Sequence, residues 1–187
     1  MMAAGRTYPN FIVPLTRDAP ADAGTSEKAY EFHFLQWAFH GAPPVPTYES
    51  ETALFPVLGA APELGKNPAT STLLFTPLQE YKLRQSFATP YLALTFYTEL
   101  AHSHGVVLLR GELTPSAAAG APAADQGEEL RYFLSQQDAQ LLAISVQRFY
   151  LWSDGEGAQA RERLLRAFHE QPEEFKWEEL LEHAEAI

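Results

Sequence analysis

The chain has 187 residues, a net charge of −11, 46% hydrophobic residues and no cysteine. This length is typical of one domain with a substantial core, so we expect a single domain spanning residues 1–187. The acidic balance argues against a nucleic-acid or anionic-membrane surface, because binding phosphates requires clustered Lys and Arg. The lack of cysteine excludes disulfides, thiolate nucleophiles and zinc–thiolate sites.

The N-terminal part predicts two strands. Residues 11–15, Phe-Ile-Val-Pro-Leu, contain a proline that cannot donate a ladder hydrogen bond, so this strand is expected at a sheet edge. In residues 30–40 aromatic and polar residues alternate, which predicts a second strand. Residues 35–39 are also compatible with a helical turn. We interpret His33 and His40 as polar residues at the rim of this strand, and we expect a short unstructured N-terminus before residue 11.

The segment 72–113 is predicted to form the centre of the sheet. Its β-prone runs are residues 72–75, 91–97 and 106–109. Residues 77–85 predict a short helix that begins with a proline, and His102-Ser103-His104-Gly105 predicts a polar turn. The loop between the last two runs is too short for a parallel crossover, so they should form an antiparallel hairpin.

Two segments, residues 41–69 and 114–130, are rich in Pro, Gly and Ala. Because long connections without periodic patterning are uncommon inside compact domains, we expect both to be poorly ordered loop insertions without chemistry of their own.

The C-terminal part predicts helices. Ser135 and Asp138 form a capping-box-like start of a helix that should run to about Trp152. The DGEG at residues 154–157 is interpreted as a turn, because the ligand ladder of a calcium loop does not follow it. A second helix is expected at residues 158–169 and a third from Pro172. Strands followed by helices predict an α+β fold, an antiparallel sheet of about five to six strands with helices packed on it.

Three motifs in the central segment give the chain a family resemblance. They are Phe75-Thr76-Pro77-Leu78-Gln79-Glu80-Tyr81-Lys82, then Tyr97-Thr98-Glu99-Leu100, then Gly105-Val106-Val107-Leu108-Leu109-Arg110-Gly111-Glu112. In order and spacing they resemble the ATP11 family of mitochondrial ATP synthase (F1-ATPase) assembly factors. Further similarity lies in residues 11–17, 35–37, 138–150 and 175–181, so the resemblance covers nearly the whole chain apart from the two insertions.

The resemblance implies a chaperone of the mitochondrial matrix with a single client. Such a protein binds the unassembled β subunit, shields its α-facing interface from aggregation and releases it to the α subunit. It implies a monomer with no cofactor, and the sequence has no Gly-rich phosphate loop followed by Lys-Ser/Thr. The opening Met-Met-Ala-Ala-Gly-Arg resembles neither a signal peptide nor an Arg-rich leader, so we expect the transit peptide to be absent from this sequence.

The polar residues of these motifs are the predicted partner-binding residues. Arg110 and Glu112 have a structural alternative, because they share a parity on one strand and can pair across the sheet or hold its edge. Lys82 and Arg84 can equally be a solvated helix face, whereas Phe75 and Phe96 are expected in the core. An exposed sheet edge would offer a second binding mode, by strand addition. The predicted binding residues are Gln79, Tyr81, Lys82, Arg84, Glu99, Arg110 and Glu112.

An enzyme and a permanent accessory subunit are the two alternatives to a transient chaperone. An enzyme would need a site such as Glu99 with His102 and His104, but no third metal ligand is suitably spaced, and Ser103 and Ser135 have no evident base. We therefore do not expect an enzyme, a metal site or a catalytic residue. A permanent accessory subunit of a lineage-specific ATP synthase remains the alternative to a transient chaperone.

Overall fold

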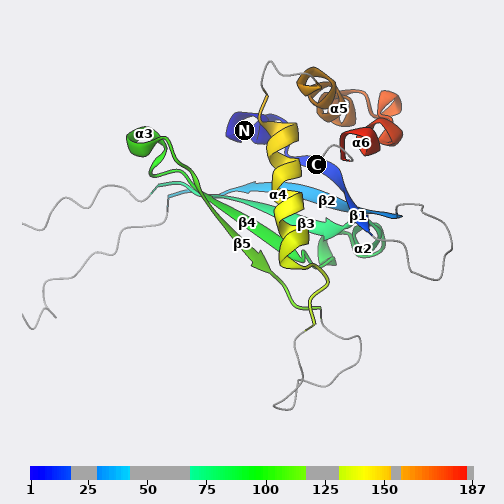
Figure 1. The fold of residues 1–187 in the computed structure, drawn as a ribbon, viewed down its shortest axis with the longest axis horizontal. Helices are drawn as coiled ribbons and strands as arrows, with labels where there is room; N and C mark the ends of the chain where they lie inside the picture. Colours follow the sequence, from blue (N-terminus) through cyan, green and yellow to red (C-terminus); the bar gives the residue numbers. More distant parts are fainter. Residues whose placement is uncertain (18–28, 43–67, 117–130, 153–156, 185–187) are drawn as a thin grey trace, which may run out of the picture.

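The computed structural model describes residues 1–17, 29–42, 68–116, 131–152 and 157–184. Five strands form one antiparallel sheet in which spatial order follows chain order, and helices pack against it (Figure 1). This is the α+β fold predicted from the sequence. The strands are β1 (Asn10–Arg17), β2 (Ala29–Phe39), β3 (Ser71–Pro77), β4 (Leu92–Tyr97) and β5 (Leu108–Leu113). The helices are α1 (Met2–Thr7), α2 (Leu78–Arg84), the 3-10 helix η2 (Gln85–Phe87), α3 (Ala101–His104), α4 (Gln136–Tyr150), α5 (Ala158–Glu170), the 3-10 helix η3 (Pro172–Glu174) and α6 (Trp177–Ala184).

The two faces of the sheet differ in burial. On β4, Leu92, Leu94 and Phe96 are buried, whereas the intervening side chains are half-buried. Because side chains alternate along a strand and neighbours in register share a face, Leu73 and Phe75 of β3 lie on the same side as Leu94 and Leu92. We call this side the core face and the opposite side the open face.

Helix α4 covers the core face and crosses the strands (Figure 1). Its start is the predicted capping box: the Ser135 hydroxyl accepts from the Asp138 N–H at 3.1 Å, and the Asp138 carboxylate accepts from the Ser135 N–H at 2.8 Å. The helix buries an apolar stripe that includes Leu142 and Phe149. The Phe149 ring lies 5.0 Å from the ring of Phe11 on β1, so α4 and the sheet share one core.

The N-terminus differs from the expectation. Residues 2–7, expected to be unstructured, form α1, which buries Gly5 against the Trp37 ring. After it, the Tyr8 carbonyl accepts a 2.9 Å hydrogen bond from the buried Tyr150 hydroxyl of α4. The C-terminal helices gather beside β1, and the third helix starts later than predicted, because Pro172 opens a 3-10 turn and α6 begins only at Trp177 (Figure 1).

The sheet edges are β1 and β5. The edge position of β1 was predicted, and residues 35–39 belong to β2, not to a helical turn. The prediction that segment 72–113 forms the sheet centre was wrong for its last run: β5 is the other edge, it starts at Leu108, and residues 106–112 are all exposed. The predicted polar turn contains the one-turn helix α3 and ends at Gly105, whose φ of 64° suits glycine. Most of both insertions and of the DGEG turn lie outside the described residues.

The prediction that His33 is a polar residue at the rim of its strand was wrong. It is fully buried on the core face of β2, and neither ring nitrogen has a hydrogen-bond partner of normal geometry among the described residues. Burial, followed by the charge of nearby Arg17, lowers the pKa of His33 to about 4, so the ring is neutral at pH 7. His40 is exposed at the end of the strand, as predicted, 3.1 Å from the Thr72 hydroxyl.

A charged cluster joins β1, β2 and α4 near His33. Arg17 donates to Glu31 at 2.8 Å and to Asp138 at 2.9 Å. Burial by itself would raise the pKa of Asp138, but hydrogen bonds from Ser135 and Arg17 outweigh it and lower the pKa. The cluster therefore holds the start of α4 onto the sheet through charge-assisted hydrogen bonds.

Candidate partner-binding surface

Helix α2 is a short, firmly attached helix at the end of β3. It starts directly after Pro77, the last residue of β3 and one position later than predicted, and η2 continues it from Gln85, whose φ is 53°. The Tyr81 ring packs on the Phe34 ring of β2 with centroids 4.2 Å apart. Phe34 pairs with Thr76 in register, on the open face, so α2 is held against the open face of the sheet.

The outer side of this segment exposes two large apolar side chains. Leu83 is 85% exposed and Phe87 is 86% exposed, far more than the other exposed large hydrophobic residues of the described chain. Leu83 follows Tyr81 by two positions, which in a helix places it about 200° around the axis, away from the sheet. Two apolar side chains this exposed on an anchored helix offer contact area to another protein. We call Leu83 and Phe87 the apolar pair.

A hollow of about 1150 Å³ lies beside the apolar pair. It is lined by α2, by residues 30–32 at the start of β2, and by the aromatic rings of Tyr91 and Phe133, which lie 5.1 Å apart. Glu80 accepts from the Thr89 N–H at 3.3 Å and pairs weakly with Arg84 at 3.5 Å. The hollow thus has an apolar floor and charged sides.

The charges around the hollow are unevenly satisfied. Burial, followed by the Glu80 carboxylate, raises the pKa of the Tyr91 hydroxyl. Lys82, exposed on α2, forms no ion pair within the described residues. This side of an otherwise acidic protein therefore offers a free cation beside apolar groups.

The structure distributes the seven predicted binding residues over three places. Gln79, Tyr81, Lys82 and Arg84 lie on α2, and all of these except Tyr81 line the hollow. Arg110 and Glu112 lie on the open face of β5 and pair with each other at 2.8 Å, along the strand and not across the sheet. Glu99 is exposed in the turn before α3. A binding role for these residues stays a prediction.

Sequence reasoning missed the apolar pair. The predicted residues were the polar members of the family motifs, so apolar residues of the same segment were left out. The available signal was a leucine at a position that helical spacing places opposite Tyr81, inside a segment that otherwise reads as polar. An apolar residue on the polar face of a short helix indicates a contact outside the chain.

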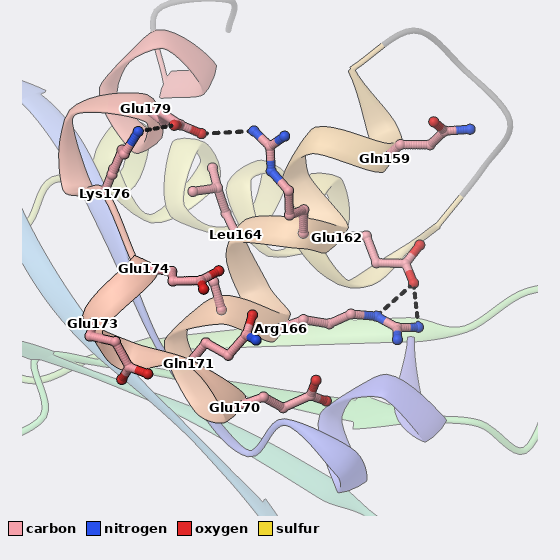
Figure 2. A pocket seen from close by; sticks show the side chains of 12 residues that line it. Gln159, Glu162, Leu164, Arg166, Glu170, Gln171, Glu173, Glu174, Lys176 and Glu179 are labelled. Atoms are coloured by element: carbon pink, nitrogen blue, oxygen red, sulfur yellow. Dashed lines mark hydrogen bonds and ion pairs between the residues drawn. The ribbon is translucent and has the colours of Figure 1, made fainter.

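A second hollow, of about 820 Å³, lies between α5, η3 and α6 (Figure 2). Its basic groups are neutralised within it: Arg166 contacts Glu162 at 2.6 Å, and Glu179 contacts both Arg163 and Lys176. Glu173 and Glu174 add further carboxylates, so the hollow is lined mainly by charged side chains, with Leu164 and Ala167 as its apolar members. It is a weaker candidate than the surface of α2.

The histidines of α3 and the helices as a group do not add a reactive or membrane-spanning feature to the described segments. His102 and His104 lie in α3, where the Ser103 hydroxyl is 2.8 Å from His104 Nδ1. Across the described segments, no three His, Asp or Glu side chains are grouped as they would be around a metal ion. None of the helices in those segments has the length and apolar character needed to cross a membrane.

Comparison with known proteins gives two findings. The family described as ATP11 protein matches residues 1–181. The curated relative Protein atp11, mitochondrial, from Schizosaccharomyces pombe is 28% identical over 169 residues, which are 90% of this chain and 42% of that protein. The chain therefore spans about two fifths of the length of the relative that it matches.

Proposed function

Because the chain belongs to the ATP11 protein family, whose match covers residues 1–181, we propose that it is an assembly chaperone of mitochondrial ATP synthase. Family membership supports a role in ATP synthase assembly in general. The finer proposal is that the chain binds the unassembled β subunit, shields the surface that later contacts the α subunit, and works in the mitochondrial matrix. The mitochondrial name of the fission-yeast relative supports that location.

The observation that carries the proposal is the apolar pair. A chaperone for one subunit needs an apolar surface of its own, because an unassembled subunit exposes an apolar interface that otherwise self-associates. Leu83 and Phe87 provide such groups on a helix whose position is set by Tyr81 and Phe34, so little order has to be created on binding. Lys82 beside them can select a client surface that carries a carboxylate.

The size of the surface suits temporary binding. Two apolar side chains and a hollow between short elements cover less area than the interface between two subunits of a permanent assembly. The α subunit can therefore displace the chaperone by forming a larger interface, without a nucleotide cycle. Transient shielding needs modest affinity and no catalysis, so we propose that the chain is not an enzyme.

The test is a binding assay of the full chain against purified monomeric β subunit, α subunit and the assembled catalytic head. Binding to β alone that is lost when α is added supports the chaperone. Co-purification with the assembled head would instead support a permanent accessory subunit. If neither isolated subunit nor the assembled head binds, the proposed client is wrong.

Two substitutions test the surface itself. Leu83→Ser and Phe87→Ser remove apolar groups that touch little within the chain, so each should weaken β binding by roughly tenfold or more if it is a central contact. Ile144→Ser is the matched control, because Ile144 is an exposed apolar residue on α4, on the core-face side of the sheet. An equal loss of binding in all three variants would contradict the assignment of the site to α2.

A further inference from the structure

Strand β5 exposes its backbone along one side. It pairs with β4 and, within the described residues, with no strand on its other side. The Thr114 N–H donates to the Tyr91 carbonyl at 3.0 Å, and Leu92 is opposite Leu113 in the register. In an antiparallel ladder hydrogen-bonded pairs alternate, so the N–H and C=O groups of Leu109, Gly111 and Leu113 point away from β4.

This edge has only part of the usual protection against pairing, namely the charges of Arg110 and Glu112 on its open face. β5 contains no proline and no lysine, and Val107, Leu108 and Leu109 are exposed large hydrophobic residues next to or within it. Within the described residues, the chain that follows β5 stays on the β4 side: Ser116 donates to the Arg131 carbonyl at 2.8 Å, and Phe133 lies on Tyr91. The edge can therefore accept another strand.

We propose that this edge pairs with β5 of a second copy of the chain, antiparallel and centred on Gly111. In this register the outward groups of Gly111 bond to those of its counterpart, and Leu109 bonds to Leu113 of the other copy. Each such pair exchanges both N–H···O=C bonds, so all the outward groups of the strand are satisfied. The two sheets join into one across a twofold axis.

Charge decides this register and this occupant. Arg110 and Glu112 lie on the open face, and pairing centred on Gly111 sets Arg110 of each copy directly opposite Glu112 of the other. A shift that centres the pairing on residue 110 or 112 sets like charges opposite each other, which is destabilising. On the core face, Leu109 is opposite Leu113 of the other copy. The strand is therefore complementary to itself in charge and in apolar pattern.

Gly111 suits the centre of this pairing. It lies on the core face opposite Leu94, and a Cβ there would come within 3.3 Å of Leu94 Cδ2. One short strand pair buries less area than a standard interface, so we expect association that depends on concentration. The dimer departs from the monomer expected from the sequence, and it uses a surface separate from the apolar pair.

The first test measures the mass of the full chain by sedimentation over a wide range of concentrations. A monomer–dimer equilibrium is expected, and Arg110→Glu should raise its dissociation constant by roughly tenfold, since it replaces two opposite-charge pairs with like-charge pairs. The double variant Arg110→Glu with Glu112→Arg should restore dimerisation, because each charge again faces its opposite. A chain that stays monomeric throughout, or a double variant as weak as the single one, would overturn the proposal.

The second test uses the absence of cysteine from the chain. In Gly111→Cys the two thiols lie on directly opposed residues with Cα atoms about 5.5 Å apart, within the range of about 4.4–6.8 Å that a disulfide requires. Oxidation should therefore link two copies of this variant, whereas the control His102→Cys, in the exposed hairpin turn, should stay unlinked. Linkage of both to the same extent would refute the register. If the Gly111→Cys variant is unfolded by circular dichroism, the charge variants still decide the question.

A partner strand from another protein is the remaining occupant. In that case the chain would stay monomeric alone, and the thiol of the Gly111→Cys variant would react with a cysteine of an added β subunit. That result would replace the self-pairing proposal. Loss of the dimer leaves β-subunit binding by α2 unaffected, so the two proposals fail separately.

Discussion

The buried His33 makes a specific prediction about acid stability. The folded protein holds the neutral ring because burial and the Arg17 charge lower the pKa to about 4, whereas an unfolded histidine has a pKa of about 6.5. A group whose pKa is lowered in the folded state binds more protons when the protein is unfolded. Its contribution to the free energy of unfolding is therefore fully present above pH 6.5 and is lost as the pH falls toward 4. His33 should therefore destabilise the fold in mild acid.

The size of the effect follows from the two pKa values. A difference of about 2.5 units corresponds to about 3 kcal/mol at pH values below both, and linkage places about 2 kcal/mol of that loss between pH 7 and pH 5. Asp138, whose pKa is lowered below its usual range, titrates at lower pH. The half-buried His183, whose pKa is lowered by burial and by the charges of Arg161 and Arg148, contributes in the same window. A variant lacking only His33 separates the two.

The assay is urea unfolding of wild type and His33→Leu at pH 7, 6 and 5. The wild-type free energy of unfolding should fall by about 2 kcal/mol more than that of His33→Leu between pH 7 and pH 5. His40→Leu is the matched control, because His40 is exposed on the same strand and should leave the pH dependence nearly unchanged. If wild type and His33→Leu lose stability in parallel, the burial argument for His33 is refuted.

Three further changes test the packing by urea unfolding at pH 7. Gly5→Ala should destabilise the protein, because the new methyl would lie 2.8 Å from Trp37 Cε2. The overpacking cost of about 1–3 kcal/mol exceeds the gain in helix propensity of about 1 kcal/mol. A net stabilisation would show that the Trp37 side chain can move away at little cost. Arg17→Met should lower the free energy of unfolding by about 1–2 kcal/mol, because its half-buried partners Glu31 and Asp138 lose their donor. Arg163→Met, which removes an exposed ion pair, should lower it by less than about 0.5 kcal/mol. Similar losses in the two variants would contradict a structural role for the Arg17 cluster. Ser135→Ala should cost about 1 kcal/mol as the loss of a helix cap, and Ser135→Asp, which keeps an acceptor, should recover most of it.

Local chemistry made several elements of this fold predictable. The capping box at Ser135 and Asp138 specifies the start of α4, because it satisfies backbone groups within one turn whatever the rest of the chain does. Pro77 similarly sets the start of α2, and Gly105 ends the turn before β5 because it accepts a positive φ. Short connections between alternating runs required the antiparallel hairpin of β4 and β5.

The sequence alone specified the α+β class, the family, the capped start of α4 and the turn that ends at Gly105, but it missed α1 and placed the start of α6 too early. Tertiary structure decided which face of β2 is buried. Alternation along a strand shows which side chains share a face, but it does not show which face α4 covers. The sequence therefore placed His33 on the wrong face. The apolar run of β5 reads as an inner strand, yet it forms an edge because no described strand follows it in the sheet. The exposure of Leu83 and Phe87 likewise depends on the side of α2 that Tyr81 attaches to Phe34. Burial is a property of the neighbours that surround a residue, and those neighbours come from distant parts of the chain.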